Sequence, residues 1–236
     1  MTGFVRLALG AAFLGLAALP AAAADLPTAK GVAPAPVVDM WSPWMVRVRA
    51  IGVLPQDGGS GRVYLPGGAL IAGSNVGVSN SVVPEIDISY FFTRNIAVEA
   101  ICCLTPHTIK AKGSIAALGT IGKAVVFPPT VMLQYHFTGL GAFKPYVGVG
   151  VNYTHYFRNG TGPNFTGLKI NDSWGVAGQI GFDYMLDQHW GINFDVKKVM
   201  MQPKAKVTLL PGGPVPLSAK VKIDPWIVGM GVTYRF

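Results

Sequence analysis

Charge is scarce in this 236-residue sequence: only 13% of the residues are charged, while 50% are hydrophobic. The mean hydropathy of +0.41 is high for a water-soluble domain. Long hydrophobic runs are also missing, since no apolar stretch reaches the ~20 residues that a membrane-spanning helix needs. These features leave two classes, a protein with a large buried core or a β-barrel whose outer face meets lipid. The length favours one domain, because β-barrels often run to roughly 200–250 residues as a unit.

Cysteines and motifs for catalysis or cofactor binding are also scarce. The two cysteines, Cys102 and Cys103, are adjacent, and neighbours in a strand point to opposite faces, so a mutual disulfide would need a distorted backbone. A lone adjacent pair also offers too few ligands for zinc, and we interpret both as small apolar residues. The sequence has no phosphate-cradling glycine motif, metal-ligand cluster or dinucleotide fingerprint. We therefore expect no cofactor, no bound metal and no catalytic residues.

The N-terminus has the pattern of a secretory signal peptide. Arg6 precedes an apolar stretch over residues 7–19, which is followed by Pro20 and the alanine tract 21–24. A basic start, a short apolar core and an Ala-x-Ala end predict cleavage after Ala24. Residues 25–43 are rich in Ala and Pro and lack periodicity, so we expect a flexible lead-in there and a folded domain over 44–236.

The net charge of +8 becomes +7 without the signal peptide, because loss of Arg6 leaves 18 basic against 11 acidic residues. No interleaved aromatic and basic motif for nucleic acid is present, and we expect no nucleic-acid partner. The lysines instead fall in or beside predicted loops, where anionic lipid head groups explain them; they are Lys110, Lys112, Lys123, Lys204, Lys206, Lys220 and Lys222.

From Trp44 onward the dominant pattern alternates with a period of two, which indicates strands with two unlike faces. In the first strand Trp44, Val46 and Val48 share one face, whereas Arg47 and Arg49 share the other. The same alternation predicts about eight strands, over residues 44–53, 84–92, 96–105, 130–137, 144–154, 172–184, 190–197 and 226–236.

The connections decide which face points outward. Long connections near residues 55–81, 106–124, 158–170 and 202–219 alternate with short ones near 93–95, 138–143 and 186–189. This asymmetry, with aromatic residues at the strand ends beside the short turns, is typical of outer-membrane barrels. We therefore predict an all-β fold, a transmembrane antiparallel up-and-down β-barrel with long extracellular loops and short periplasmic turns.

The polar face then lines the barrel lumen. A register shift that placed Arg47 and Arg49 in lipid would cost about 2–4 kcal/mol for each residue, so both arginines should point inward. We expect them to join a structural network of ion pairs and hydrogen bonds. The predicted members are Arg47, Arg49, Glu85, Asp87, Glu99, Gln134, His136, Asp183, Asp195 and Lys197.

At several places the sequence resembles the OmpW family of outer-membrane proteins. The resemblance rests on Pro84-Glu85-Ile86, Ser89-Tyr90-Phe91-Phe92-Thr93, Asn95-Ile96-Ala97-Val98-Glu99, Pro128-Pro129-Thr130, Gln134-Tyr135-His136-Phe137, Pro145-Tyr146-Val147-Gly148, Gly150, Asn152-Tyr153-Thr154, Asp172-Ser173-Trp174-Gly175, Asp224-Pro225-Trp226 and Tyr234-Arg235-Phe236. It covers essentially all of residues 44–236 in the family's order. Tyr234 and the terminal Phe236 also resemble the insertion signal of such barrels, which implies the barrel-assembly machinery as a partner.

The resemblance implies a narrow, partly apolar pathway for small hydrophobic molecules in the outer membrane of a Gram-negative bacterium, with outer-membrane lipid and lipopolysaccharide around it. By their facing, Ile101 and Met132 are the candidate apolar contacts in the lumen. Leu54, Val63 and Leu65 are candidates for an external mouth.

Two other functions stay open. The proline- and glycine-rich last loop is stiff and exposed enough for a receptor or adhesion role. A lipid-modifying enzyme would need a nucleophile beside a base, but none of the four histidines has a serine at a convincing local spacing. We expect His107 and His155 to be solvated near loops, His136 to join the polar interior and His189 to lie in a turn. We favour a protein that is not an enzyme.

Overall fold

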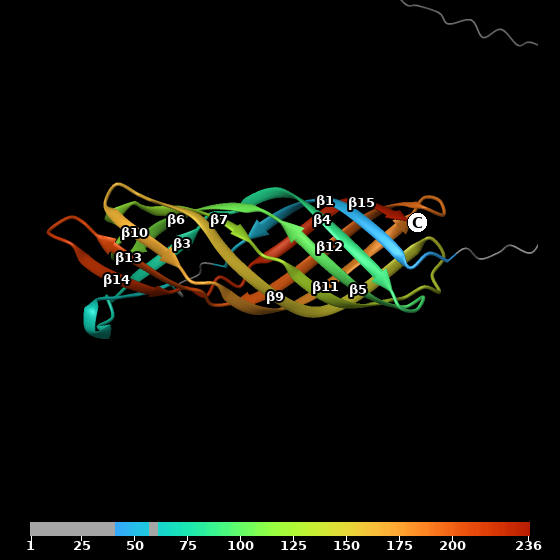
Figure 1. Ribbon diagram of the computed structural model, residues 1–236, viewed down its shortest axis with the longest axis horizontal. Helices are drawn as coiled ribbons and strands as arrows, with labels where there is room; N and C mark the ends of the chain where they lie inside the picture. Colours follow the sequence, from blue (N-terminus) through green and yellow to red (C-terminus); the bar gives the residue numbers. More distant parts are fainter. Residues whose placement is uncertain (1–40, 57–60) are drawn as a thin grey trace, which may run out of the picture. The chain divides into compact units, whose positions relative to one another are not determined.

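The computed structural model describes residues 41–56 and 61–236, which are almost entirely β-structure (Figure 1). The predicted signal peptide and residues 25–40 of the predicted lead-in lie outside the described residues. Two short 3-10 turns, η1 (Pro66–Gly68) and η2 (Ala116–Leu118), are the helical segments of this part of the chain. No helix within it has the length and hydrophobicity to cross a membrane.

Eight antiparallel strands close into a barrel. Each strand pairs with the next, and the last pairs back onto the first, from Met45 opposite Arg235 to Leu54 opposite Trp226. The prediction of an eight-stranded up-and-down barrel is therefore confirmed. The strands are β1 (Trp44–Leu54), β4 (Ser81–Phe91), β5 (Ile96–Cys103), β8 (Thr130–His136), β9 (Phe143–Thr161), β11 (Ser173–Met185), β12 (Trp190–Met201) and β15 (Trp226–Arg235).

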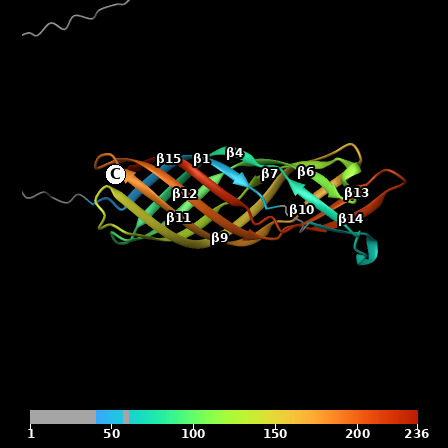
Figure 2. The same ribbon diagram turned by 180° about the vertical axis from the view of Figure 1, so that it is seen from behind.

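The long connections are themselves β-structure, which differs from the predicted loops. Beyond the barrel, β9 continues to pair with β7, β7 with β6 and β6 with β3, while β10, β13, β14 and β2 form a separate four-stranded sheet. We call these seven strands the extension, and the end of the barrel that carries it the long-loop end (Figures 1 and 2). They are β2 (Arg62–Tyr64), β3 (Ser74–Val78), β6 (Thr105–Gly113), β7 (Thr120–Phe127), β10 (Phe165–Ile170), β13 (Lys204–Leu209) and β14 (Val215–Lys220).

The short turns meet at the opposite end, beside the C-terminus (Figure 2). Asp187 organises one of them, since its carboxylate accepts hydrogen bonds from the backbone N–H groups of His189 and Trp190, both at 2.7 Å. These hydrogen bonds lower the pKa of Asp187. Aromatic rings pack edge to face around this rim, as Tyr234 does with Trp190 and with Phe236.

Side chains alternate between the two faces of the barrel wall as the sequence predicts. The outer wall carries exposed apolar residues such as Val149 and Ile180, which are 67% and 62% exposed, while the interior carries buried charged ones. Towards the long-loop end a second aromatic group appears on the outside, where the ring centroids of Tyr153 and Trp174 lie 4.9 Å apart. Two sets of aromatic residues therefore border the apolar band, as expected for a barrel in a membrane.

Candidate functional site

The barrel interior is filled by a network of charged and amide side chains, which we call the polar plug. It contains the ten residues that the sequence analysis assigned to the lumen, and none of them is more than 3% exposed. Its members are Arg47, Arg49, Glu85, Asp87, Glu99, Gln134, His136, Asp183, Asp195 and Lys197, joined by Gln179, Asn193 and Tyr146.

Arg47 is at the centre of the first half of the plug. Its guanidinium makes two hydrogen bonds to Asp183, at 3.0 and 2.6 Å, and reaches Glu99 at 2.6 Å. The fork of the guanidinium matches the two oxygens of a carboxylate, which fixes both the geometry and the charge pairing. The ring of Tyr146 lies beneath the guanidinium, 4.8 Å from its carbon to the ring centroid.

Arg49 and Lys197 organise the second half. Arg49 lies opposite Glu85 in the register of β1 and β4, and its guanidinium is 2.9 Å from Glu85 and 2.7 Å from Asp87. The Lys197 ammonium is 3.0 Å from Glu85 and 3.1 Å from Asp195. Because strand register sets these neighbours, the pairing follows from the same alternation that turns the charged residues inward.

The plug has a direct consequence for the lumen. An eight-stranded barrel has an interior only just wide enough for its side chains, and here those side chains are tied to one another across the barrel. Removing one partner of a buried ion pair is costly, because the other charge is left uncompensated. The plug therefore obstructs a straight path along the barrel axis.

Three members of the plug were not predicted from the sequence. Gln179 bonds to Glu99 and Asp195, and Asn193 bonds to Asp183 and Tyr146. Gln179 and Asn193 lie on the predicted inner face, but the prediction of the network rested mainly on charged residues. Tyr146 was not predicted, because tyrosine is also common in the aromatic rims of such barrels.

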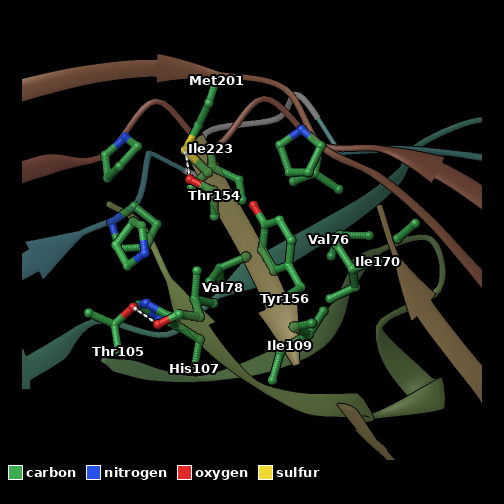
Figure 3. Close-up of a pocket in the computed structure, with 18 of the residues that line it drawn as sticks. Val76, Val78, Thr105, His107, Ile109, Thr154, Tyr156, Ile170, Met201 and Ile223 are labelled. Carbon is green, nitrogen blue, oxygen red and sulfur yellow. Dashed lines mark hydrogen bonds between the residues drawn. The ribbon is translucent and has the colours of Figure 1, made fainter. Parts of the chain in front are cut away.

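An apolar cavity of about 130 Å³ lies above the plug at the long-loop end (Figure 3). Its upper walls come from the core of the extension, where side chains of both sheets meet; the buried members are Val63, Val76, Ala111, Ile121, Phe165, Leu217 and Val221. Its lower walls include Ile51, Val53 and Ile101 of the barrel strands, and the paired side chains of Glu85 and Lys197 also line it. The cavity thus lies directly above the charged residues of the plug.

Only some of the apolar residues predicted for the lumen and the external mouth line the cavity. Ile101 and Val63 line the cavity, and Met132 is fully buried and packs in one cluster with Ile101. Leu54 and Leu65 do not line it and are 41% and 40% exposed. The expectation for Leu54 was wrong because Leu54 shares the outward face of β1 with Trp44 and Val48, and Leu65 follows β2 on the outside of the extension.

The position of His107 also differs from the prediction. We expected a solvated loop residue, but His107 lies on the inner face of β6, is 9% exposed and lines the cavity. Its Nδ1 is 2.7 Å from the carbonyl oxygen of Ser79, which only accepts hydrogen bonds, so Nδ1 carries the proton. Burial lowers the pKa of His107, although this hydrogen bond opposes the shift. The neutral ring therefore leaves Nε2 as an acceptor.

The other histidines lie where the sequence placed them. His136 is buried in the plug, and the exposed His155 contacts Asp172, with 2.9 Å between Nδ1 and a carboxylate oxygen. His189 stands in a short turn, and Tyr234 and Phe236 contact one another at the same end. Cys102 is exposed and Cys103 is buried, both as free thiols. Within residues 41–56 and 61–236, no group of three His, Cys, Asp or Glu side chains could hold a metal ion.

The hydrogen-bonded wall is interrupted at one side of the cavity. β5 pairs with β8 up to Ile101 opposite Thr130, and β6 pairs with β7 from Thr105 opposite Val126 onward. Between these two rows Pro128 and Pro129 have no N–H to donate. The inward residues Cys103 and Pro128 line the cavity, whereas Leu104 is 53% exposed on the outer face. Cys102–Leu104 and Phe127–Pro129 thus face one another without strand pairing between them, while Cys102 and Cys103 still pair with β4 and Phe127 with β9.

Comparisons with known proteins agree with this architecture. The model of the OmpW family matches residues 43–236. An uncharacterised outer-membrane protein of Sinorhizobium fredii, y4mB, is 49% identical over 231 residues, which cover 97% of this chain and 94% of the relative. The crystal structure of the outer-membrane protein OprG from Pseudomonas aeruginosa is similar with a TM-score of 0.76 and 31% identity, over 82% of this chain and 95% of that one.

A more distant relative carries an informative name. The dibenzothiophene metabolism operon protein PahQ of Pseudomonas aeruginosa is 26% identical over 196 residues, which cover 83% of this chain and 89% of the relative.

Proposed function

The chain belongs to the OmpW family of outer-membrane proteins, and from this premise we propose that it gives small hydrophobic molecules a pathway into the outer membrane. The long-loop end is the extracellular end of such a barrel. The observation that carries the proposal is the apolar cavity at this end, which is walled by aliphatic and aromatic side chains.

The size and chemistry of the cavity suit a small apolar solute. Its volume of about 130 Å³ is close to the roughly 150 Å³ of an engineered apolar cavity that stays dry and binds benzene. One aromatic ring or a short aliphatic chain therefore fits. The name of PahQ points the same way, since dibenzothiophene is an apolar aromatic compound.

The polar plug restricts where a hydrophobic solute can leave the cavity. A hydrophobic solute gains nothing by entering a network of paired charges, and side chains fill the space there. The interruption between Cys102–Leu104 and Phe127–Pro129 borders the cavity and faces outward at the level of Tyr153, whose N–H donates to the carbonyl of Pro129 at 3.0 Å. We propose that solutes leave the cavity sideways at this interruption and enter the lipid layer.

The first test fills the cavity. Ala124 is 3% exposed and lines it, whereas its neighbour Val125 faces the other side of β7. We expect Ala124→Trp to reduce uptake of radiolabelled toluene to the background rate, in vesicles whose outer leaflet contains lipopolysaccharide. Val125→Trp is the matched control and should keep the parent rate. Equal uptake by the Ala124→Trp variant, folded by its heat-dependent electrophoretic mobility, would contradict the proposal.

The second test closes the exit without filling the cavity. The register on both sides places Cys103 opposite Pro128, and cross-strand neighbours lie within the Cα separation that a disulfide spans. In a Cys102→Ser background, Pro128→Cys should form a disulfide with Cys103 under oxidation. Uptake should fall on oxidation and return on reduction. If the oxidised protein transports as fast as the reduced one, solutes do not use this exit.

A further inference from the structure

The apolar cavity carries a small set of polar groups on one wall. Thr105 and His107 stand two residues apart on the inner face of β6, and both line the cavity. Tyr156 lies on the same wall, because Val126 pairs with Thr105 on one side and with Tyr156 on the other. These three side chains are 2%, 9% and 8% exposed, and Figure 3 shows all three among the labelled residues around the pocket.

None of the three groups has its hydrogen-bonding capacity satisfied. His107 Nδ1 is bound to the Ser79 carbonyl, while its Nε2 has no partner among the described residues. The Thr105 hydroxyl reaches only the Val126 carbonyl at 3.5 Å, at the limit of a hydrogen bond. The Tyr156 hydroxyl makes no hydrogen bond of good geometry in this part of the chain, although the Ser173 side chain lies beside it. Buried polar groups are normally paired, and an unpaired one costs about 1–3 kcal/mol.

The polar groups at the floor and lower wall of the cavity do not share this property. Glu85 and Lys197 pair with one another, Asn152 donates to Thr130 at 2.8 Å, and Thr154 donates to Asn152 at 2.6 Å. The unsatisfied groups are therefore confined to the wall formed by β6, β7 and β9. Ala124, the small residue opposite His107 in the β6–β7 register, leaves space beside them.

Resting on the proposed function, we propose that this wall selects solutes that carry a hydroxyl group on a small apolar body, such as phenols, over pure hydrocarbons of the same shape. A hydroxyl both donates and accepts. It donates its proton to Nε2 of the neutral His107 and accepts a hydrogen bond from the hydroxyl of Thr105. The apolar body lies against the side chains of the extension core.

This arrangement explains selection in energetic terms. A hydrocarbon in the cavity leaves His107 Nε2 without a partner and Thr105 with one marginal hydrogen bond, whereas a hydroxylated solute of equal shape pairs with both. A site that hydrogen-bonds a hydroxyl discriminates strongly against an analogue that lacks it, because the polar groups of the site then stay unpaired. His107 and Thr105 are thus specificity-determining residues.

The test uses two isosteric probes, 4-fluorophenol and 4-fluorotoluene. Their dissociation constants are measured by fluorine NMR with the full chain in lipid nanodiscs, and empty nanodiscs correct for partitioning into lipid. His107→Leu and Thr105→Val remove the two polar contacts, and Thr105→Val conserves the shape of the side chain. Ile109→Val, at the next inward position of β6, is the control.

In each of the two polar variants we expect the preference for fluorophenol over fluorotoluene to fall about fivefold, the size of one net hydrogen bond. The affinity for fluorotoluene should stay within about twofold of the parent value on the same scale. Ile109→Val should change the two affinities together.

Equal losses for both probes in both polar variants, or no change in the preference, would overturn the inference while the hydrophobic pathway stands. Binding of neither probe by the parent protein would overturn the pathway itself, and the inference with it. If His107→Leu does not fold, the Thr105→Val variant decides alone.

Discussion

The barrel and the extension have opposite arrangements of polarity, although β9 runs through both. The outward residues Cys102 of β5 and Leu104, just after it, are apolar, whereas the inward Glu99 of β5 is charged. Further along the same run of chain, in β6, the outward residue Lys110 is charged and the inward Ala111 is buried among apolar side chains. From Glu99 to Ala111 odd-numbered residues such as these face inward and even-numbered ones face outward, yet the polarity of the two faces is exchanged.

The medium outside the wall explains the exchange. Where lipid surrounds the wall, charged groups are stable only inside, and they must then neutralise one another. Where water surrounds it, the hydrophobic effect gathers apolar side chains inside, and lysines cover the exterior. The cavity lies where the two arrangements meet, so its apolar walls and its charged floor come from two different physical requirements.

The largest effect should come from breaking the barrel arrangement at its centre. Arg47→Met leaves Glu99 and Asp183 buried without their cation, and we expect the free energy of unfolding to fall by about 3–5 kcal/mol. Arg62→Met, on the exposed face of β2, should change it by less than about 0.5 kcal/mol. Urea titration in lipid vesicles, followed by tryptophan fluorescence, measures both. An Arg47→Met barrel as stable as the parent would show that the plug is dispensable.

The corresponding test in the extension truncates an apolar residue. Phe165 is 3% exposed in the core of the extension, and Phe165→Ala should destabilise this region by about 3–5 kcal/mol, up to its own stability. Hydrogen exchange should accelerate in β10 and β13 and stay unchanged in β1 and β12. Thr166→Ala, on the exposed neighbour, is the control. Faster exchange throughout the barrel would indicate that the two regions unfold together.

One strand allows the two exteriors to be compared with the same substitution. Val149 and His155 both point outward from β9, on either side of the Tyr153 ring. Val149→Arg should reduce the free energy of unfolding by about 2–4 kcal/mol, because the charge meets hydrocarbon. His155→Arg should stay within about 0.5 kcal/mol of the parent, because water solvates it. Equal effects at both positions, measured by the same urea titration, would contradict a boundary between lipid and water at Tyr153.

The smallest effect concerns pH. Burial lowers the pKa of His107 from its ordinary value of 6.5, so the unfolded extension binds more protons than the folded one below that value. The stability of the extension is therefore fully present above pH 6.5 and is lost as the pH falls, with a slope of at most ~1.4 kcal/mol per pH unit.

His107→Gln should reduce this pH dependence. Hydrogen exchange of β6 between pH 5 and pH 7, corrected for the intrinsic rate, gives the comparison. Parent and His107→Gln curves that run parallel would assign the dependence to another group.

The sequence predicted the barrel better than the extension for a physical reason. In the barrel each strand has a charged inner face and an apolar outer one, so Arg47 and Arg49 reveal their direction through the cost of placing them in lipid. In the extension Lys204 and Lys206 alternate with small or apolar residues, and a lysine in water carries no comparable penalty. Loops and exposed strands then look alike.

Part of the site depended on contacts that no local pattern reveals. Pro128 and Pro129 are visible as strand breakers, but their position opposite Cys102–Leu104 follows only from the register of two strand pairs. The burial of His107 likewise depends on a second sheet, because the four-stranded sheet of β10, β13, β14 and β2 closes the cavity from the far side. Such closure is a long-range property of the fold.

Spin labels on the continuous outer face of β5 and β6 test the boundary most directly. Cys102 is labelled in a Cys103→Ala background, and Lys110→Cys in a background that lacks both native cysteines. In lipid bilayers the label at position 102 should relax with oxygen and resist a water-soluble nickel complex, and the label at 110 should behave in the opposite way. A label at 102 that the nickel complex reaches as readily as it reaches 110 would contradict a wall that passes from lipid to water between β5 and β6.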